Sequence, residues 1–279
     1  MIGLLLAAGL PVAIFLFIIY RKDKQKEPPG LLVKCFLLGC VATVPIVIVE
    51  LIVGELNNFN SAFLTSFYDA FIVAALVEEG FKFLFLYWII WHRREFDQHY
   101  DGIVYAVFVS LGFALVENIL YVVDLGFGVA IMRGLLSVPG HGLFGVCMGY
   151  FFALAKFAPD RRRRKKQLWL SFLVPVLFHG LYDFFLMYLD THENTLIILL
   201  LFAGFVGVMI CLWRIGIKFI KRHLAKDYEM MVWSFWYQQQ AILYGYAYPQ
   251  APPYQYQQYP QGYQQPSYGY ANPHVTNKK

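Results

Sequence analysis

The sequence predicts an all-α protein, a polytopic helical membrane protein with about seven transmembrane helices. Hydrophobic residues make up 59% of its 279 residues and charged residues only 15%, a charge content well below that of a soluble domain. Apolar runs long enough to cross a bilayer recur along the chain. The loops between them alternate between basic and non-basic composition. We therefore expect a multi-pass protein of the cell membrane.

The first four helices follow from apolar runs and from the charge of the loops after them. The first run lacks a basic n-region and a cleavage site, and basic residues follow it, which indicates a retained span. The loop after the second run contains no Lys or Arg, whereas Arg93 and Arg94 follow the third. These helices are expected at 2–20, 31–53, 67–91 and 102–123.

The last three helices continue the same alternation. The loop before the fifth run has Asp124 as its one charged residue, and the run itself contains Pro139, which predicts a kink or local unwinding. Six consecutive Arg and Lys residues at 161–166 precede the sixth run, and basic residues follow the seventh. These helices are expected at 129–157, 168–189 and 195–217.

The same loop charges predict orientation and domain organisation. Basic loops stay in the cytoplasm, so the N-terminus is expected outside and the C-terminus in the cytoplasm. We interpret the basic run at 161–166 as a topology signal and a contact for anionic lipids, and we expect no nucleic-acid partner. Residues 1–226 are expected to form the transmembrane domain, with a functional core at 67–189. Residues 227–279, rich in Tyr, Gln and Pro, are expected to form a disordered cytoplasmic tail.

Charged residues inside the apolar runs are the main indication of function. Glu78 and Glu79 are adjacent in the middle of the third run, and Lys82 follows one turn later. A carboxylate at the centre of a bilayer costs at least a few kcal/mol, so such residues usually serve chemistry or transport. Because Glu78 and Lys82 are four residues apart, the ammonium can lie against a carboxylate on one helix face. We predict that the glutamate pair is functional and that Lys82 is its charge partner.

Polar residues of several runs fall at two depths. The deeper level lies ~15–18 Å below the outer surface, at the helical rise of ~1.5 Å per residue. It contains Glu78, Glu79, His141 and His179. The second level lies ~6–9 Å below that surface. It contains Glu117, Arg133 and Asp183. Unrelated polar residues would have no reason to form layers, so we expect one site.

Spacing within two helices suggests how the histidines are held. His179 and Asp183 are four residues apart, so the carboxylate can orient the imidazole. His141 shares one helix stripe with small residues that let a neighbouring helix approach closely. This stripe continues through Gly145, Gly149 and Ala153.

Two carboxylates and two imidazoles around a watery cavity can activate water against a peptide bond. In one version Glu79, His141 and His179 hold Zn²⁺, which lowers the pKa of its bound water, and the second glutamate acts as base. In the other version no metal is present, a glutamate deprotonates the water and the histidines stabilise the oxyanion. The sequence contains no H-E-x-x-H motif, no serine nucleophile elbow and no aspartyl pair of the intramembrane type, and both versions stay open.

Four motifs, in order, resemble the signature of the PrsW family of intramembrane proteases. They are E-E-x-x-K at Glu78–Lys82, F-x-x-x-E-N at Phe113–Asn118, R-x₇-H at Arg133–His141 and H-G-x-Y-D at His179–Asp183. The resemblance covers residues 67–189, and the family is similar to the wider group of CAAX-prenyl-type membrane proteases. In those relatives a His stands at the place of Glu117 and an Asn at the place of Asp183.

The resemblance implies cleavage of a membrane-anchored protein, in the best-known case site-1 cleavage of an anti-sigma factor. It also implies catalytic importance for Glu78, Glu79 and His141, with His179 in support. We therefore predict an intramembrane endopeptidase of the glutamic or metallo type. A proton- or cation-coupled transporter and a non-catalytic scaffold are the alternatives, because buried Glu and His also form proton relays. The residues expected to support the site are Lys82, Glu117, Asn118, Arg133 and Asp183.

Overall fold

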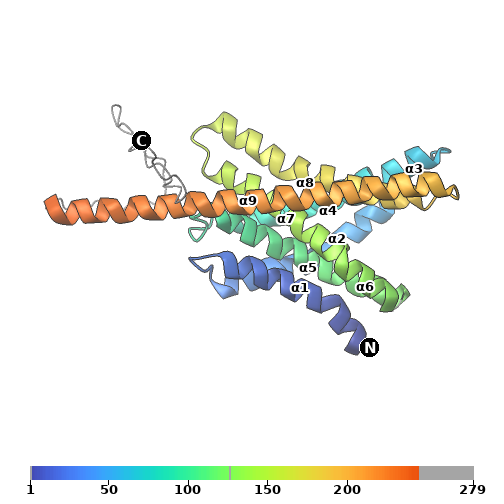
Figure 1. Cartoon of the computed structure of the whole chain (residues 1–279), viewed down its shortest axis with the longest axis horizontal. Helices are drawn as coiled ribbons and strands as arrows, with labels where there is room; N and C mark the ends of the chain where they lie inside the picture. Colours follow the sequence, from blue (N-terminus) through green and yellow to red (C-terminus); the bar gives the residue numbers. More distant parts are fainter. Residues whose placement is uncertain (1, 126, 245–279) are drawn as a thin grey trace, which may run out of the picture.

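The computed structural model describes residues 2–125 and 127–244, and its regular secondary structure over this part of the chain is entirely helical (Figure 1). The all-α prediction is therefore confirmed for these residues. In chain order the elements are α1 (Ile2–Lys22), α2 (Pro29–Gly54), α3 (Ala62–Tyr68), η1 (Asp69–Leu76), α4 (Val77–Ile90), α5 (His99–Leu125), α6 (Phe127–Leu135), α7 (Ser137–Lys156), α8 (Arg161–Leu189) and α9 (Thr195–Tyr244).

Five helical stretches within the described residues are long and apolar enough to cross a membrane. They are Pro29–Gly54, His99–Val123, Ile131–Lys156, Arg161–Leu189 and Thr195–Trp236. They correspond to five of the seven expected spans. The expected first span corresponds to α1, and the expected third span is divided into α3, η1 and α4, which follow one another without a break from Ala62 to Ile90.

The π-helix η1 is the main departure within the third span, where we expected a regular helix. It occupies Asp69–Leu76, and Glu78 and Glu79 lie directly after it, in the first turn of α4. A π-helix carries one extra residue per hydrogen-bonded turn, so it rotates the side chains that follow it. Such segments are rare and occur frequently at functional sites.

The expected fifth helix at 129–157 is two helices, and the break lies before Pro139 rather than at it. α6 ends at Leu135 and α7 begins at Ser137, with Leu136 between them at φ −116° and ψ −57°. Pro139 is the third residue of α7. The first N–H groups of a helix have no intrahelical partner, so a proline costs no hydrogen bond at that position.

Two predicted boundaries are wrong because helices extend past the apolar runs. α8 already begins at Arg161, where the side chain of Asp160 caps it by accepting from the Arg163 N–H at 2.8 Å. α9 continues to Tyr244 instead of ending near 217, so residues 227–244 are helical where we expected a disordered tail. Figure 1 shows its far half projecting beyond the other helices. The rest of the predicted tail, 245–279, lies outside the described residues.

The extension of α9 is held by contacts with the beginning of α5. The carboxylate of Asp227 accepts from the backbone N–H of His99 and of Tyr100, both at 2.8 Å. One turn earlier, the ring of His223 is buried and its Nδ1 lies 2.7 Å from the carbonyl oxygen of His99. Asp227 thus caps a helix that begins 128 residues earlier in the chain.

α5 and α7 form the centre of the bundle and approach each other at glycines. A Cβ added at Gly149 would lie 2.2 Å from the carbonyl oxygen of Gly102, and one at Gly145 would lie 3.0 Å from the Cα of Val107. The predicted small-residue stripe therefore does face a tightly packed neighbour. A second close approach, between Gly39 of α2 and the backbone of α5, was not predicted from the sequence.

Contacts near the ends of the helices mark the two ends of the bundle. At one end the Tyr100 hydroxyl donates to the Ile19 carbonyl at 3.0 Å, and the Lys156 ammonium donates to the Trp91 carbonyl at 2.6 Å. These contacts join the regions that carry the basic loops. At the opposite end the Asn57 amide donates to Asp69 at 2.7 Å. The loops that alternate in charge along the chain are therefore separated in space, with the basic loops at one end of the bundle and the other loops at the opposite end.

Candidate functional site

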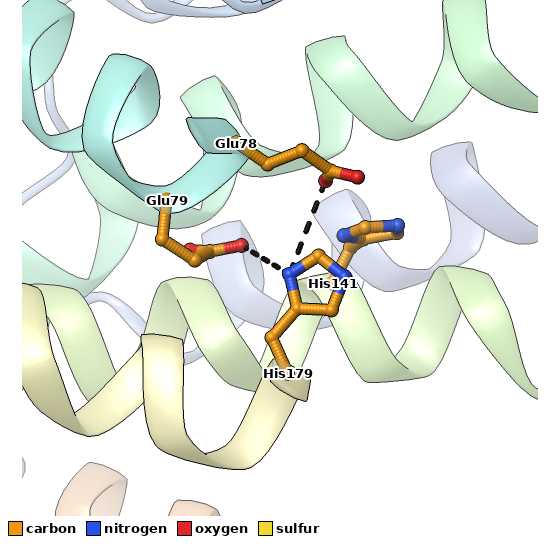
Figure 2. Close-up of side chains that lie close together, drawn as sticks. All are labelled: Glu78, Glu79, His141 and His179. Atoms are coloured by element: carbon orange, nitrogen blue, oxygen red, sulfur yellow. Dashed lines mark hydrogen bonds and ion pairs between the residues drawn. The ribbon is translucent and has the colours of Figure 1, made fainter. Parts of the chain in front are cut away.

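Three helices bring the four deep polar residues predicted from the sequence to one place. Glu78 and Glu79 come from α4, His141 from α7 and His179 from α8 (Figure 2). Each offers one possible ligand atom, and these atoms all lie within 4.8 Å of one another. All four residues are buried, with at most 5% of their surface exposed. We call Glu78, Glu79, His141 and His179 the tetrad.

Lys82 contacts three of the four tetrad residues. Its ammonium is 2.9 Å from a carboxylate oxygen of Glu78 and 2.9 Å from one of Glu79. It is also 3.3 Å from Nδ1 of His141, and it lies 4.0 Å from the centre of the Phe113 ring. The predicted pairing with Glu78 is present, but Lys82 also contacts Glu79 and His141. Its charge compensates two adjacent carboxylates that burial would otherwise strongly destabilise.

His179 bridges the glutamate pair and Asp183. Its Nδ1 is 3.0 Å from Glu79 and 3.9 Å from Glu78, and Figure 2 shows both carboxylates directed toward this nitrogen. On the other side of the ring, Nε2 is 3.1 Å from Asp183, which is the contact that the four-residue spacing predicts. Phe144 stacks on the ring with a centroid distance of 4.7 Å. The orientation of His179 is therefore determined from both edges and one face.

His141 is held in the same way by a residue that the sequence did not pair with it. Its Nε2 is 2.9 Å from Glu117, a residue of α5, while Nδ1 faces Lys82. Because an ammonium can only donate, Nδ1 of His141 accepts and Nε2 donates to Glu117. No sequence signal paired these two residues, since they belong to different helices and were expected at different depths.

Arg133 and Asn118 complete the second level of polar residues. The guanidinium of Arg133 lies 2.6 Å from the Glu117 carboxylate and compensates its charge. Its Nε donates to the Asn118 side chain at 2.9 Å. Glu117, Arg133 and Asn118 thus form one chain of contacts that ends on His141.

The donor set fits a metal ion. Each histidine directs Nδ1 into the tetrad and contacts a carboxylate outside it through Nε2. Metal-binding histidines usually bond a carboxylate through their second nitrogen in this way. In addition, Oε2 of Glu79 is buried without a hydrogen-bond partner among the described residues. Nitrogen and carboxylate oxygen are ligands that Zn²⁺ accepts, so Glu79, His141 and His179 suit this ion.

The four residues of the tetrad are buried, whereas we expected them to line a watery cavity. Aromatic rings of Phe113 and Phe144 pack against its histidines. The second level is more open, since the side chains of Glu117 and Asp183 are 18% and 20% exposed. The more exposed side chains of the site therefore lie toward the end of the bundle without basic loops.

The π-helix packs against the element that carries His179. A Cβ added at Gly180 would lie 2.3 Å from the ring of Phe71, a residue of η1. Only a residue without a side chain allows η1 and α8 to approach so closely next to His179. Gly180 belongs to the H-G-x-Y-D motif, but its contact with η1 was not predicted from the sequence.

The chain is similar to known proteins over most of its length. Residues 27–212 match the family model described as PrsW family intramembrane metalloprotease. The chain is 39% identical to Protease PrsW of Oceanobacillus iheyensis over 222 residues, which cover 80% of this chain and 96% of that protein. It is 37% identical to Protease PrsW of Bacillus subtilis over 229 residues, which cover 81% and 98%. With Protease PrsW of Clostridioides difficile it shares 34% identity over 228 residues, which cover 80% and 92%. No solved structure matches the chain.

Proposed function

Because the chain belongs to the PrsW family of intramembrane metalloproteases, we propose that the tetrad is the site at which it hydrolyses peptide bonds of membrane-anchored proteins. The observation that carries this proposal is the convergence of two carboxylates and two imidazoles from three helices, with ligand atoms within 4.8 Å. Family membership identifies a peptidase, so it decides against the transporter and the scaffold that the sequence left open.

We assign the metal to Glu79, His141 and His179, and the base to Glu78. A bound Zn²⁺ supplies an activated water and polarises the scissile carbonyl. The surroundings of the two glutamates support different roles for Glu78 and Glu79. The side chain of Glu79 is fully buried and one of its oxygens has no hydrogen-bond partner among the described residues, whereas the Glu78 side chain retains 7% exposure. The more accessible carboxylate is the better placed to meet water.

The chemical step needs one proton to move twice. Glu78 takes a proton from the water as the oxygen attacks the peptide carbonyl, and it gives a proton to the amine as the C–N bond breaks. The ammonium of Lys82, 2.9 Å from Glu78, is the neighbouring fixed positive charge. It compensates the glutamates before the reaction and stabilises the negative charge that develops on the carbonyl oxygen.

The carboxylates of Asp183 and Glu117 act by holding the two histidines in place. Asp183 contacts Nε2 of His179 and Glu117 contacts Nε2 of His141, so each fixes the ring orientation and leaves Nδ1 for the ion. Arg133 compensates the charge of Glu117, and Asn118 holds Arg133. These residues position the catalytic groups without touching the reacting atoms.

The side of cleavage follows from the two ends of the bundle. The end with basic loops is assigned to the cytoplasm, which puts the N-terminus outside. Glu117 and Asp183 then face the outer half of the membrane, so cleavage takes place there. A membrane-anchored signalling protein cut at a first site, such as an anti-sigma factor, is the corresponding substrate class. The basic loops at the opposite end contact anionic lipids.

The test uses the full chain in proteoliposomes with a single-span protein substrate. Glu78→Gln, His141→Ala and His179→Ala are each expected to abolish cleavage while the chain remains folded. Glu95→Gln and His192→Ala, which change the same residue types in loops outside the tetrad, are expected to cleave normally. Cleavage that persists in Glu78→Gln removes this residue from the mechanism, and cleavage that survives complete chelation supports the glutamate mechanism without a metal.

A further inference from the structure

A groove lies on the outside of the bundle, between α2 and the end of α4, and it is separate from the tetrad. It encloses about 710 Å³. Its lining combines two kinds of side chain. Lys34, His92 and Arg93 are basic or can become so, and Leu37, Val41 and Trp88 are apolar. All six are exposed.

The three basic residues lie at one end of the groove. Lys34 is in the second turn of α2, and His92 and Arg93 directly follow α4, which runs antiparallel to α2. The Arg93 Nε donates to the Ile89 carbonyl at 3.3 Å, so the guanidinium is held at the end of its helix. This is also the end of the bundle that carries the basic loops. Three such side chains around one opening favour a phosphate group.

The apolar residues continue the groove toward the middle of the membrane. Leu37 and Val41 are three and seven residues beyond Lys34, on the same face of α2, so the apolar part reaches ~10 Å from the basic end. Trp88 faces it from α4 and is 72% exposed. Tryptophan is enriched at the level of lipid headgroups, where its ring lies between polar and apolar surroundings.

We propose that this groove binds one anionic phospholipid of the leaflet that faces the basic loops. Its phosphate lies at Lys34, His92 and Arg93, and an acyl chain covers Leu37, Val41 and Trp88. Basic pockets between helices on the cytoplasmic side of membrane proteins bind such headgroups. Free phosphate would match only the basic end and would leave the apolar part uncovered. This inference does not rest on the proposed catalytic roles, and its test requires no proteolysis.

The test measures lipid binding to the purified full chain in detergent. Native mass spectrometry counts bound lipid, and the thermal unfolding midpoint reports stabilisation. The probes are phosphatidylglycerol, phosphatidylcholine with the same acyl chains, and inorganic phosphate. We expect one retained phosphatidylglycerol and a rise of the midpoint with this lipid alone. Equal stabilisation by phosphatidylcholine, or by inorganic phosphate, would overturn the proposal.

Variants decide whether the groove is the site. Because each Lys or Arg near an anionic lipid contributes about a fivefold gain in affinity, Lys34→Gln/Arg93→Gln is expected to weaken phosphatidylglycerol binding about thirtyfold. The matched control, Arg214→Gln/Lys218→Gln, removes the same charge from exposed positions of α9 outside the basic loops and is expected to bind normally.

A third variant, Val41→Trp, fills the apolar part without changing charge and is expected to lose the retained lipid. Because Val41 is exposed, this variant should fold normally. It therefore tests the groove even if the double variant does not fold. Retention of phosphatidylglycerol by both groove variants, or an equal loss in the control, contradicts a site between α2 and α4.

Discussion

Replacing Glu117 by Gln tests whether the second level of polar residues holds the histidines that we propose as metal ligands. Glu117 accepts from Nε2 of His141 at 2.9 Å and forms an ion pair with the Arg133 guanidinium at 2.6 Å. Glutamine keeps the size of the side chain but offers one neutral acceptor in place of two charged oxygens. Hydrogen bonds to an ionised acceptor are roughly twice as strong as neutral ones, so both contacts weaken.

The expected magnitude follows from the role of such partners at metal sites. Loss of a carboxylate that orients a ligating histidine lowers metal affinity by about 10- to 100-fold. Glu117→Gln should therefore bind Zn²⁺ more weakly by that factor and recover cleavage at saturating zinc. Glu78→Gln should behave in the opposite way, because the base is not among the proposed ligands. It should retain zinc affinity and lose cleavage.

Zinc affinity is measured by competition with a chelator of known strength, on the purified full chain in detergent. Circular dichroism checks that the helices persist. Asp190→Asn, which changes an exposed carboxylate after α8, serves as the control and should leave affinity unchanged. An affinity of Glu117→Gln within twofold of the unmodified chain would refute the reasoning. So would an equal loss of zinc in Glu78→Gln, since the two glutamates would then have the same role.

Three further predictions concern stability. Burial raises the pKa of Glu27 from 4.5 to about 7, so the folded chain holds this proton more tightly than the unfolded chain does. The free energy of unfolding should therefore fall as pH rises between about 4.5 and 7. Glu27→Gln should reduce the dependence of the thermal unfolding midpoint on pH, and an unchanged dependence contradicts this prediction. Gly149→Ala places a Cβ 2.2 Å from a backbone oxygen of α5 and should cost about 1–3 kcal/mol in denaturant unfolding, whereas Gly207→Ala, with open space around it, should not destabilise. Asp227→Ala removes a helix cap and should cost about 0.5–2 kcal/mol, and an equal effect of Glu229→Ala would mean that the cap contributes nothing.

Apolar runs and loop charges predicted the helices well where local hydrophobicity and charge decide where a helix begins and ends. They failed where a tertiary contact decides the boundary. The helix that we expected to end near 217 continues because Asp227 caps the distant beginning of α5. The break in the fifth helix lies at Leu136 and not at Pro139, since a proline is tolerated in the first turn. Nothing in the composition of 69–76 distinguishes the π-helix from a regular one.

The sequence predicted which residues form the site better than it predicted the contacts between them. Intramembrane charge and equal depth selected the tetrad, because both follow from the helical rise and from the cost of burying charge. Spacing along one helix also predicted the contacts of Lys82 with Glu78 and of Asp183 with His179. The contact between Glu117 and His141 joins two helices, and its geometry depends on how α5 and α7 pack at Gly149. A single sequence does not show how two helices pack against each other, so it could not predict this contact.

The charges of the site lead to a last prediction. The fixed cations in the network are Lys82 and Arg133, and its carboxylates are Glu78, Glu79, Glu117 and Asp183. Two negative charges are therefore left without a fixed partner. Uncompensated charge is very costly in a buried site, so about two protons or one divalent cation must balance them. One proton belongs to His179, because both of its nitrogens face carboxylate oxygens.

Binding of Zn²⁺ should consequently release about two protons. The number is measured by titration calorimetry in buffers of different ionisation enthalpy, where proton release makes the observed heat depend on the buffer. Asp183→Asn removes one of the negative charges, so the released number should fall by about one. A control with Asp190→Asn should release the original number. Heat that is independent of the buffer would mean that the ion enters a site whose charge is already balanced, and the tetrad would then not be the place where it binds.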